Sequence, residues 1–370
     1  MKVLMIGVDD THAGGMLTVV KNYLECREFC EKTNLTYIAT ATRGTALQRI
    51  AFFLGALGKT ALALYRERPD VVHIHMAERG SVARKGIVAF LAHRAGAKVV
   101  IHMHAATLEV WYRRQGRLGR RLIGLCLGQA DRMILLGEFM VPMMEEILGP
   151  KKDRIRVLYN SVQAPEENPY RADRTGILFY GALIRRKGIE DLLEAFRRIL
   201  PEIPEDVHLI LCGDDAEHRI GELIRRCGLE GRAQYRGWMS REQQEACFSE
   251  AMIHVLPSYH EGLPMAVLET MGYGIPNITT RVAAIPEVVE DGVNGILLRP
   301  GDVDGLAANL RDLIGDAPRR MRLSGEAHRT IRGGFSFPAH IERLLSIYGE
   351  LMKEQAGRRR RKRAADGRKA

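Results

Sequence analysis

Cysteine is scarce in this sequence and is not arranged for metal binding or cross-linking. Only six cysteines occur in 370 residues, and no C-x-x-C pair or Cys/His cluster has metal-ligand spacing. A chain of this length buries a sufficient core without disulfides. We therefore expect free thiols, with Cys26 and Cys30 buried on a helix.

A secretory signal and a long hydrophobic run are also missing. The first residues, MKVLMIGVDDTHAGG, lack a signal-peptide core and cleavage site, and they are more typical of a strand. The longest apolar run, Ile50 to Tyr65, is interrupted by Lys59 and falls short of the ~20 residues that span a bilayer. These absences predict a cytoplasmic protein without a membrane span.

Charge is unevenly distributed along the chain, whose formal net charge is +10. Residues 1–170 carry 24 basic and 16 acidic side chains, residues 171–356 carry 23 and 28, and residues 357–370 carry eight and one. The basic run at the C-terminus is typical of a disordered tail. The sequence thus predicts a basic half, an acidic half and a basic tail.

Short β-branched runs alternate with helical patterns along the whole chain, which predicts parallel sheets covered by helices. Strands are expected within 3–8, 71–75, 98–102, 133–136 and 155–158, and again within 177–180, 207–211, 253–256, 277–279 and 295–298. The segment 163–175, QAPEENPYRADRT, has two prolines and no apolar periodicity, as expected of a linker. We predict an α/β protein of two Rossmann-like, doubly wound domains facing a central cleft: 1–162 with a crossover helix at 337–356, and 176–336.

The first strand leads into Gly14-Gly15 at the start of a helix. Paired glycines let backbone N–H groups approach a phosphate at the positive end of a helix. Simple turn chemistry explains the pair equally well, and the G-x-G-x-x-G pattern is absent.

A stronger motif spans residues 258–276, SYHEGLPMAVLETMGYGIP. Glu261-Gly262-Leu263-Pro264 precedes a predicted helix, whose N-terminus would offer free N–H groups to an anion. Glu269 lies two turns along this helix on an otherwise apolar surface, where a carboxylate could accept two ribose hydroxyls. A capping acid and a surface glutamate form the alternative interpretation.

With its surroundings, this E-x7-E motif resembles the retaining nucleotide-sugar glycosyltransferases of glycosyltransferase family 4, which have the GT-B fold. The resemblance is densest over 253–302 and includes TTRVAAIPEVVEDGVNGILLRPGD and the strand-loop-helix FYGALIRRKG. The N-terminal segments VVHIHMAERGSVARKG and KVVIHMHAATLEVWY are similar to members that build bacterial capsular, exopolysaccharide or lipopolysaccharide chains.

The resemblance implies roles for individual residues. Lys187 and Arg185 would neutralise the leaving diphosphate without a metal, Glu261 would hold sugar hydroxyls, and Glu269 would hold the ribose. Gly262, Leu263 and Pro264 would also bind the donor. Gly14 and Gly15 would lie on the diphosphate or acceptor side, and His104 would contact the transferred sugar.

One position departs from the family pattern. The family carries arginine directly after the glycine that corresponds to Gly181, where this chain has Ala182. We therefore expect Arg185 or Arg186 to replace it.

No metal-ligating residue is expected. Asp302-Val303-Asp304 matches a D-x-D signature, but it follows Pro300-Gly301 and is better explained as a helix cap. His73 and His75 alternate on a strand, which permits a metal pair, although histidines lining the core or the cleft are the favoured interpretation.

Two basic segments suggest an anionic membrane surface as a partner. The segment Trp111–Leu125 combines arginines with an apolar helical face, as helices lying on membranes do. The 357–370 tail could add a second attraction. A solvated helix face, and nucleic-acid binding by the tail, are the rival explanations; we expect no nucleic acid.

These observations predict transfer of a sugar, with retention, from a nucleotide sugar to a lipid-linked or saccharide acceptor in bacterial surface polysaccharide synthesis. No cofactor is expected, and a UDP-sugar is favoured over a GDP-sugar as the donor. The protein is expected on the inner face of the plasma membrane. A nucleotide-sugar epimerase on the same fold, or a non-catalytic basic binding module, are the alternatives.

Overall fold

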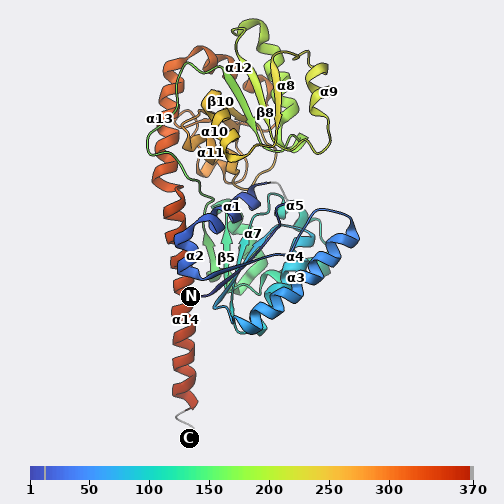
Figure 1. Ribbon diagram of the computed structural model, residues 1–370, viewed down its shortest axis with the longest axis vertical. Coiled ribbons are helices and arrows are strands. Elements are labelled where there is room, and N and C mark those ends of the chain that lie inside the picture. Colours follow the sequence, from blue (N-terminus) through green and yellow to red (C-terminus); the bar gives the residue numbers. More distant parts are fainter. Residues whose placement is uncertain (12–13, 367–370) are drawn as a thin grey trace. The chain divides into compact units, whose positions relative to one another are not determined.

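The computed structural model describes residues 1–11 and 14–366, and for residues 358–366 the backbone alone. The chain divides into two compact units (Figure 1). Unit 1 comprises Met1–Tyr159 and the chain from Pro338 onward, and unit 2 comprises Asn160–Phe337. Each unit contains one six-stranded sheet in which every pairing is parallel.

The sheet of unit 1 has the strand order β2-β1-β3-β4-β5-β6. Its strands are β1 (Val3–Gly7), β2 (Leu35–Ala39), β3 (Val71–Met76), β4 (Lys98–Met103), β5 (Arg132–Leu135) and β6 (Ile155–Val157). The helices are α1 (Gly15–Glu25), α2 (Arg27–Thr33), α3 (Ala46–Arg66), α4 (Gly80–Arg94), α5 (Leu108–Arg113), α6 (Arg117–Leu127), α7 (Val141–Leu148) and α14 (Phe337–Asp366).

The two faces of this sheet are chemically different because successive strand residues point to opposite sides. One face packs Leu4, Val72 and Ile101 into an apolar cluster with residues of α3, α4, α6 and α7. On the other face, His73 of β3 contacts Tyr23 of α1, Tyr348 of α14 and His102 of β4. The first face supplies most of the apolar burial in unit 1, and the second places polar rings in its interior.

The sheet of unit 2 has the order β12-β11-β10-β7-β8-β9. Its strands are β7 (Gly176–Tyr180), β8 (His208–Cys212), β9 (Ala233–Gly237), β10 (Ala251–Leu256), β11 (Asn277–Thr280) and β12 (Ile296–Leu298). The helices are α8 (Ile189–Ile199), α9 (Ile220–Arg226), α10 (Arg241–Glu250), α11 (Met265–Gly272), α12 (Val303–Gly315) and α13 (Ala317–Gly334). The predicted pair of parallel-sheet Rossmann-like domains is confirmed.

The segment 163–175 is not a linker, contrary to the sequence prediction. Tyr170 is buried, and its hydroxyl donates a 3.0 Å hydrogen bond to the carbonyl of Met252. The guanidinium of Arg174 donates to the carbonyl of Phe248. This segment lacks apolar periodicity because single side chains, rather than a helix or strand face, hold it to unit 2.

The prediction of a disordered tail from 357 is wrong as far as residue 366, because α14 continues to Asp366. Arginine and lysine are good helix formers, so the basic run extends a helix that is already anchored. The anchor is Arg132 of β5, whose guanidinium pairs with Glu350 and Glu354 of α14. The last part of the predicted tail, 367–370, lies outside the described residues.

Candidate functional site

The residues that sequence analysis selected fall into two groups. Arg185, Lys187, Glu261 and Glu269, together with the loop 262–264, belong to unit 2, whereas Gly14, Gly15 and His104 belong to unit 1. Apart from Glu269, which lies within α11, the residues of each unit lie where strands end and helices begin, which is the ligand-binding edge of a parallel sheet.

The turn from β7 to α8 places three basic residues at this edge of unit 2. They form the single 3-10 turn Arg185–Lys187, which Gly188 ends with φ of 75°. A Cβ atom on Gly188 would lie 2.2 Å from the carbonyl oxygen of Pro257. Glycine is therefore required here, both by the backbone conformation and by the close approach of the two loops.

Lys187 and Glu261 form a largely buried ion pair. The ammonium nitrogen of Lys187 lies 2.5 Å from Oε1 of Glu261, and the side chains are 16% and 6% exposed. The hydroxyl of Ser258 donates a second hydrogen bond to the same oxygen, at 2.7 Å. The loop after β10 thus holds one carboxylate against the cation of the β7–α8 turn, and hydrogen bonds of this charged kind are the stronger ones.

The two candidate arginines differ in their surroundings. The guanidinium of Arg186 donates to the backbone carbonyl of His260, at 2.5 Å, so this side chain ties the two loops together. Arg185 is exposed, and among the described residues its side chain makes no hydrogen bond or ion pair. Arg185 is therefore the arginine that can reach a ligand without breaking a contact.

The loop from Glu261 to Pro264 is fixed through its backbone. Asn160 donates a side-chain hydrogen bond to the carbonyl of Leu263, at 2.8 Å. The carbonyl of Gly262 accepts from the backbone N–H of Ala284, at 3.1 Å. Pro264 then leads directly into α11, as the sequence predicted, so the first N–H groups of this helix follow the loop.

Glu269 sits in the middle of α11, half-buried against α10. Burial raises the pKa of its carboxyl to about 7, against the opposing effects of a hydrogen bond from Gln244 and the charge of Arg241. The side chain is thus neither a capping acid nor a solvated surface glutamate. It can change its charge near neutral pH.

His104 follows β4 in unit 1 and is only partly buried. One of its ring nitrogens, Nε2, lies 2.9 Å from Nδ1 of His75. His75 belongs to a buried group of rings that also includes His73, His102 and Tyr348. His104 is therefore the partly accessible end of a ring network whose remaining members are inside unit 1.

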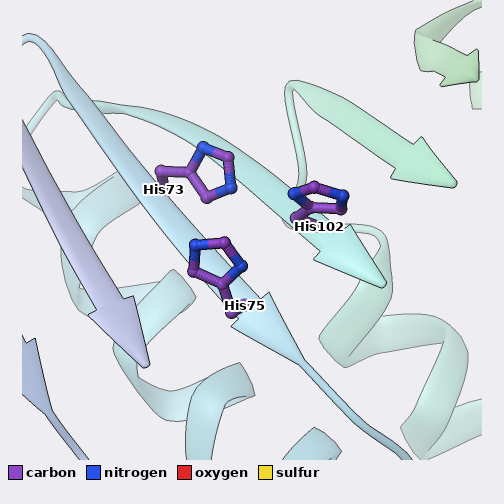
Figure 2. Close-up of side chains that lie close together, drawn as sticks. All are labelled: His73, His75 and His102. Atoms are coloured by element: carbon purple, nitrogen blue, oxygen red, sulfur yellow. The ribbon is translucent and has the colours of Figure 1, made fainter. Parts of the chain in front are cut away.

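Figure 2 shows three histidines of this network from β3 and β4. Nδ1 of His73 lies 2.5 Å from the hydroxyl of Tyr348, while both nitrogens of His102 and Nε2 of His73 and His75 have no partner among the described residues. Burial lowers the pKa of His73 to about 3, and it holds the pKa of His75 and His102 well below the usual range. The rings are therefore neutral near pH 7.

These three histidines are also the group in the described part of the chain whose ligand atoms could hold a metal ion. One nitrogen from each ring lies within 4.8 Å of the nitrogens of the other two, and neutral imidazole is a common ligand of zinc. Asp302 caps α12: its Oδ1 accepts a 2.8 Å hydrogen bond from the N–H of Gly305 at the start of the helix, which confirms the helix-cap interpretation.

Gly14 is the residue before α1 and has φ of 135°. Such a positive φ favours glycine, which agrees with a strand–helix turn. Residues 12–13 of the same loop lie outside the described residues. The assignment of Gly14 and Gly15 to phosphate binding stays a prediction.

Comparison with known proteins now identifies the family. Residues 33–161 match the family model "Glycosyl transferase 4-like domain", and residues 163–330 match "Glycosyl transferases group 1". The chain belongs to the GT-B glycosyltransferases of the family 4 type.

Individual relatives agree with this assignment. The glycosyltransferase is 25% identical over 334 residues to N-acetyl-alpha-D-glucosaminyl L-malate synthase of Bacillus anthracis, covering 85% of this chain and 84% of that one. It is 29% identical over 177 residues to the lipopolysaccharide core biosynthesis glycosyltransferase LpsE of Rhizobium meliloti, covering 48% and 50%. The crystal structure of Anabaena HepE in complex with UDP has a TM-score of 0.73 at 17% identity, covering 95% of this chain and 100% of that one, and it is alike in fold.

The structure of the glycosyltransferase corrects the part of the membrane prediction that concerns the aromatic residues at the start of the segment Trp111–Leu125. Tyr112 is buried, with the guanidinium of Arg120 over its ring, and Trp111 packs against the apolar cluster of unit 1. These aromatic residues therefore face inward. The exposed large apolar residues of the segment Trp111–Leu125 are Leu118, Leu122 and Leu125, all on α6.

Several contacts of the glycosyltransferase were not expected from its sequence. Ser258 lies three residues before Glu261, inside the selected motif, but nothing in the motif marked it as a partner of the carboxylate. The ring network had a visible signal: the repeats His73-Ile-His75 and His102-Met-His104 place four rings on one face of neighbouring strands.

Proposed function

We propose that this glycosyltransferase transfers a sugar from a UDP-sugar, with retention and without a metal in the transfer step, to a lipid-linked or saccharide acceptor in surface polysaccharide synthesis. The single observation that carries the proposal is the Lys187–Glu261 pair, which brings a cation and a sugar-binding carboxylate together at one loop junction of unit 2. A UDP donor is supported by the HepE complex with UDP, and the pathway by the resemblance to LpsE.

In this proposal, Lys187 and Arg185 bind the donor diphosphate. Negative charge grows on the leaving phosphate as the bond to the sugar breaks, and fixed cations stabilise it most when they are already in place. Lys187 is held in place by Glu261, and Arg185, two positions before Lys187 in the chain, is exposed. Arg186 keeps its contact with His260 and shapes the loop.

Glu261 binds hydroxyls of the transferred sugar. Its hydrogen bonds with Lys187 and Ser258 both involve Oε1. A carboxylate has a second oxygen with its own lone pairs, so Oε2 can accept a sugar hydroxyl while the ion pair persists. Glu269 binds the ribose hydroxyls in its charged form, and His104 of unit 1 contacts the transferred sugar.

An anionic membrane surface is the proposed partner of unit 1, through the outer side of α3, α4 and α6, which we call the α3–α4–α6 face. Helix α4 packs between the other two, and all three cover the same side of the sheet (Figure 1). Their sequences contain nine lysine and arginine residues, of which Lys85 is buried, and no aspartate or glutamate. Exposed apolar side chains stand among these basic residues: Leu47, Ile50, Leu54, Phe90, Leu118 and Leu125. This combination suits a surface rich in anionic lipid.

In the described part of the chain, α3 is the one helix long and apolar enough to cross a membrane. Its mean hydropathy over the relevant window is 1.3, but Ala56, Thr60 and Leu64 are buried in unit 1. It connects β2 to β3 within one sheet. We therefore propose that α3 lies on the membrane rather than through it.

A transfer assay tests the catalytic part of the proposal. Purified protein with UDP- or GDP-sugars and a membrane acceptor fraction is expected to release UDP only when the acceptor is present. Glu261→Ala is expected to abolish release, whereas Glu222→Ala, an exposed glutamate of α9, is expected to retain it. Conversion of the UDP-sugar without any acceptor would indicate an epimerase instead.

Vesicle flotation tests the membrane part. Leu54→Gln combined with Leu118→Gln is expected to reduce binding to vesicles that contain phosphatidylglycerol at least about tenfold, because lost apolar burial of 1.4 kcal/mol corresponds to a factor of ten. Leu24→Gln with Val293→Gln changes two exposed residues that lie off the α3–α4–α6 face and is expected to have little effect. Equal loss with both pairs would refute the assigned face, and binding of duplex DNA in place of vesicles would refute the choice of partner.

A further inference from the structure

A basic pocket lies at the carboxyl edge of the unit 1 sheet, and none of the residues proposed to bind the donor or the transferred sugar lines it. It is lined by the loop that follows β2, residues 40–44, and by the side chains of Arg49 on α3 and Arg84 on α4. The carboxyl ends of strands are where parallel sheets bind ligands.

Arg49 and Arg84 repel each other in this pocket. Burial and the neighbouring charge of Arg49 lower the pKa of the half-buried Arg84. Among the described residues neither guanidinium has a hydrogen-bond or ion-pair partner, and no acidic residue lines the pocket. Two converging cations without a counter-ion are arranged to receive an anion.

The backbone around the pocket adds to its positive potential. Helix α3 begins at Ala46 with a capping box formed by Thr45 and Gln48, so its N-terminal end points toward the same loop. The positive end of a helix dipole favours an anion nearby. The potential of the pocket therefore comes from the arginines that line it, Arg43 among them, and from one helix end.

We propose that this pocket binds the phosphate or diphosphate group of the lipid-linked acceptor. A planar guanidinium matches phosphate geometry with two parallel hydrogen bonds, and Arg49 and Arg84 supply two such groups. The lipid assignment comes from the neighbouring surface: the first turns of α3 expose Leu47 and Ile50, which are 77% and 58% accessible. An acyl or prenyl chain attached to a bound phosphate would lie against these residues.

This inference rests on the proposed function for the identity of the ligand, but it can be measured without sugar transfer. The probes are a short-chain polyprenyl diphosphate in detergent and inorganic diphosphate, each titrated into the full chain by calorimetry with saturating UDP present. The pocket variant is Arg49→Gln with Arg84→Gln. The matched control is Arg225→Gln with Arg226→Gln, which removes the same charge from exposed positions of α9, outside the pocket and outside the α3–α4–α6 face.

The pocket variant is expected to bind polyprenyl diphosphate at least about tenfold more weakly than the wild type, and the control within about twofold, since each tenfold step corresponds to one lost strong contact. The thermal midpoint of the pocket variant is expected to equal or exceed that of the wild type, because the two substitutions relieve the repulsion between the arginines and break no contact. If the pocket variant and the control weaken polyprenyl diphosphate binding equally, or if neither weakens it, the proposal is overturned. Inorganic diphosphate that binds as tightly as the lipid would overturn the lipid assignment.

Failure of the pocket and failure of the proposed function are distinguishable. If no nucleotide sugar is turned over but lipid diphosphate binding still depends on Arg49 and Arg84, the pocket stands and the proposed reaction fails. If transfer occurs and the pocket variant shows an unchanged KM for the lipid acceptor, the reaction stands and the pocket fails.

Discussion

Nζ of Lys187 and Oε1 of Glu261 lie 2.5 Å apart at the junction of two loops of unit 2 that are 74 residues apart in the chain. Each charge is the buried partner of the other, so neither can be removed alone without leaving an uncompensated charge. The pair therefore has a structural role in the free protein and a proposed role in donor binding, and the two can be separated by measurement.

Lys187→Met is expected to lower kcat by about 10²-fold or more, as loss of one fixed group that stabilises the transition state does. It is also expected to lower the thermal midpoint, since Glu261 loses its partner. Arg226→Met, on the exposed side of α9, is the control and is expected to change neither value. Steady-state kinetics and thermal unfolding of the same samples check both. A lowered midpoint with normal kcat would leave the pair a purely structural role.

Donor affinity is expected to rise with pH through about 7. The folded pKa of Glu269 is raised to about 7 by burial, so the carboxylate that would accept the ribose hydroxyls forms only above this value. UDP titrations between pH 5.5 and pH 8.5 measure the effect; this range brackets the pKa. Glu269→Gln is expected to flatten the profile, and Glu245→Gln, exposed on α10, is expected to leave it in place. A wild-type profile without a rise near pH 7 would exclude Glu269 from donor binding.

Two glycines are expected to respond oppositely to alanine. Gly188→Ala forces a side chain into a positive-φ position against the carbonyl of Pro257, and backbone strain of this kind costs about 1–3 kcal/mol before the clash is counted. Gly58→Ala fills open space on exposed α3, where alanine is the better helix former by about 0.5–1 kcal/mol. Denaturant unfolding of both variants checks the signs. If Gly188→Ala and Gly58→Ala were equally stable, the β7–α8 turn would tolerate a side chain at position 188 and would be looser than the structure shows.

Stability of unit 1 is expected to fall as the pH drops from about 6.5 toward 3. The pKa of His73 and of His104 is lowered to about 3, chiefly by burial, so the unfolded chain binds more protons than the folded one in this range. Each such histidine adds a slope of at most about 1.4 kcal/mol per pH unit.

His102→Leu tests this expectation, because His102 is buried and its nitrogens have no partner among residues 1–11 and 14–366. The variant is expected to reduce the pH dependence of unfolding, and His93→Leu, exposed on α4, is expected not to. An unchanged slope in His102→Leu would mean that this ring takes up a proton in the folded state.

The fold was predictable from the sequence because most strands are buried on both faces and read as apolar runs. The two strands that sequence analysis missed, β2 and β9, each lie at one edge of their sheet; the strands at the opposite edges, β6 and β12, were predicted. Residues of β2 are half-buried throughout, and β9 exposes Gln234 and Tyr235. An edge strand has a neighbour on one side only, so its sequence carries less of the apolar signal.

The resemblance selects Lys187, Glu261 and Glu269 by motif, and their roles in donor binding stay a prediction. Their partners were not predictable: Ser258 and Gln244 acquire their roles from loop and helix geometry. The pocket of Arg49 and Arg84 was invisible for the same reason. Two arginines 35 positions apart become neighbours only when α3 and α4 pack side by side.

The central claim is transfer of a sugar with retention by a site built on Glu261 and Lys187. Its most direct test is NMR of the product formed from an α-linked UDP-sugar and a purified lipid-linked acceptor, with Glu261→Ala run in parallel. The account predicts an α-linked product from the wild type and no product from the variant. A β-linked product, or equal product from the variant, would contradict it.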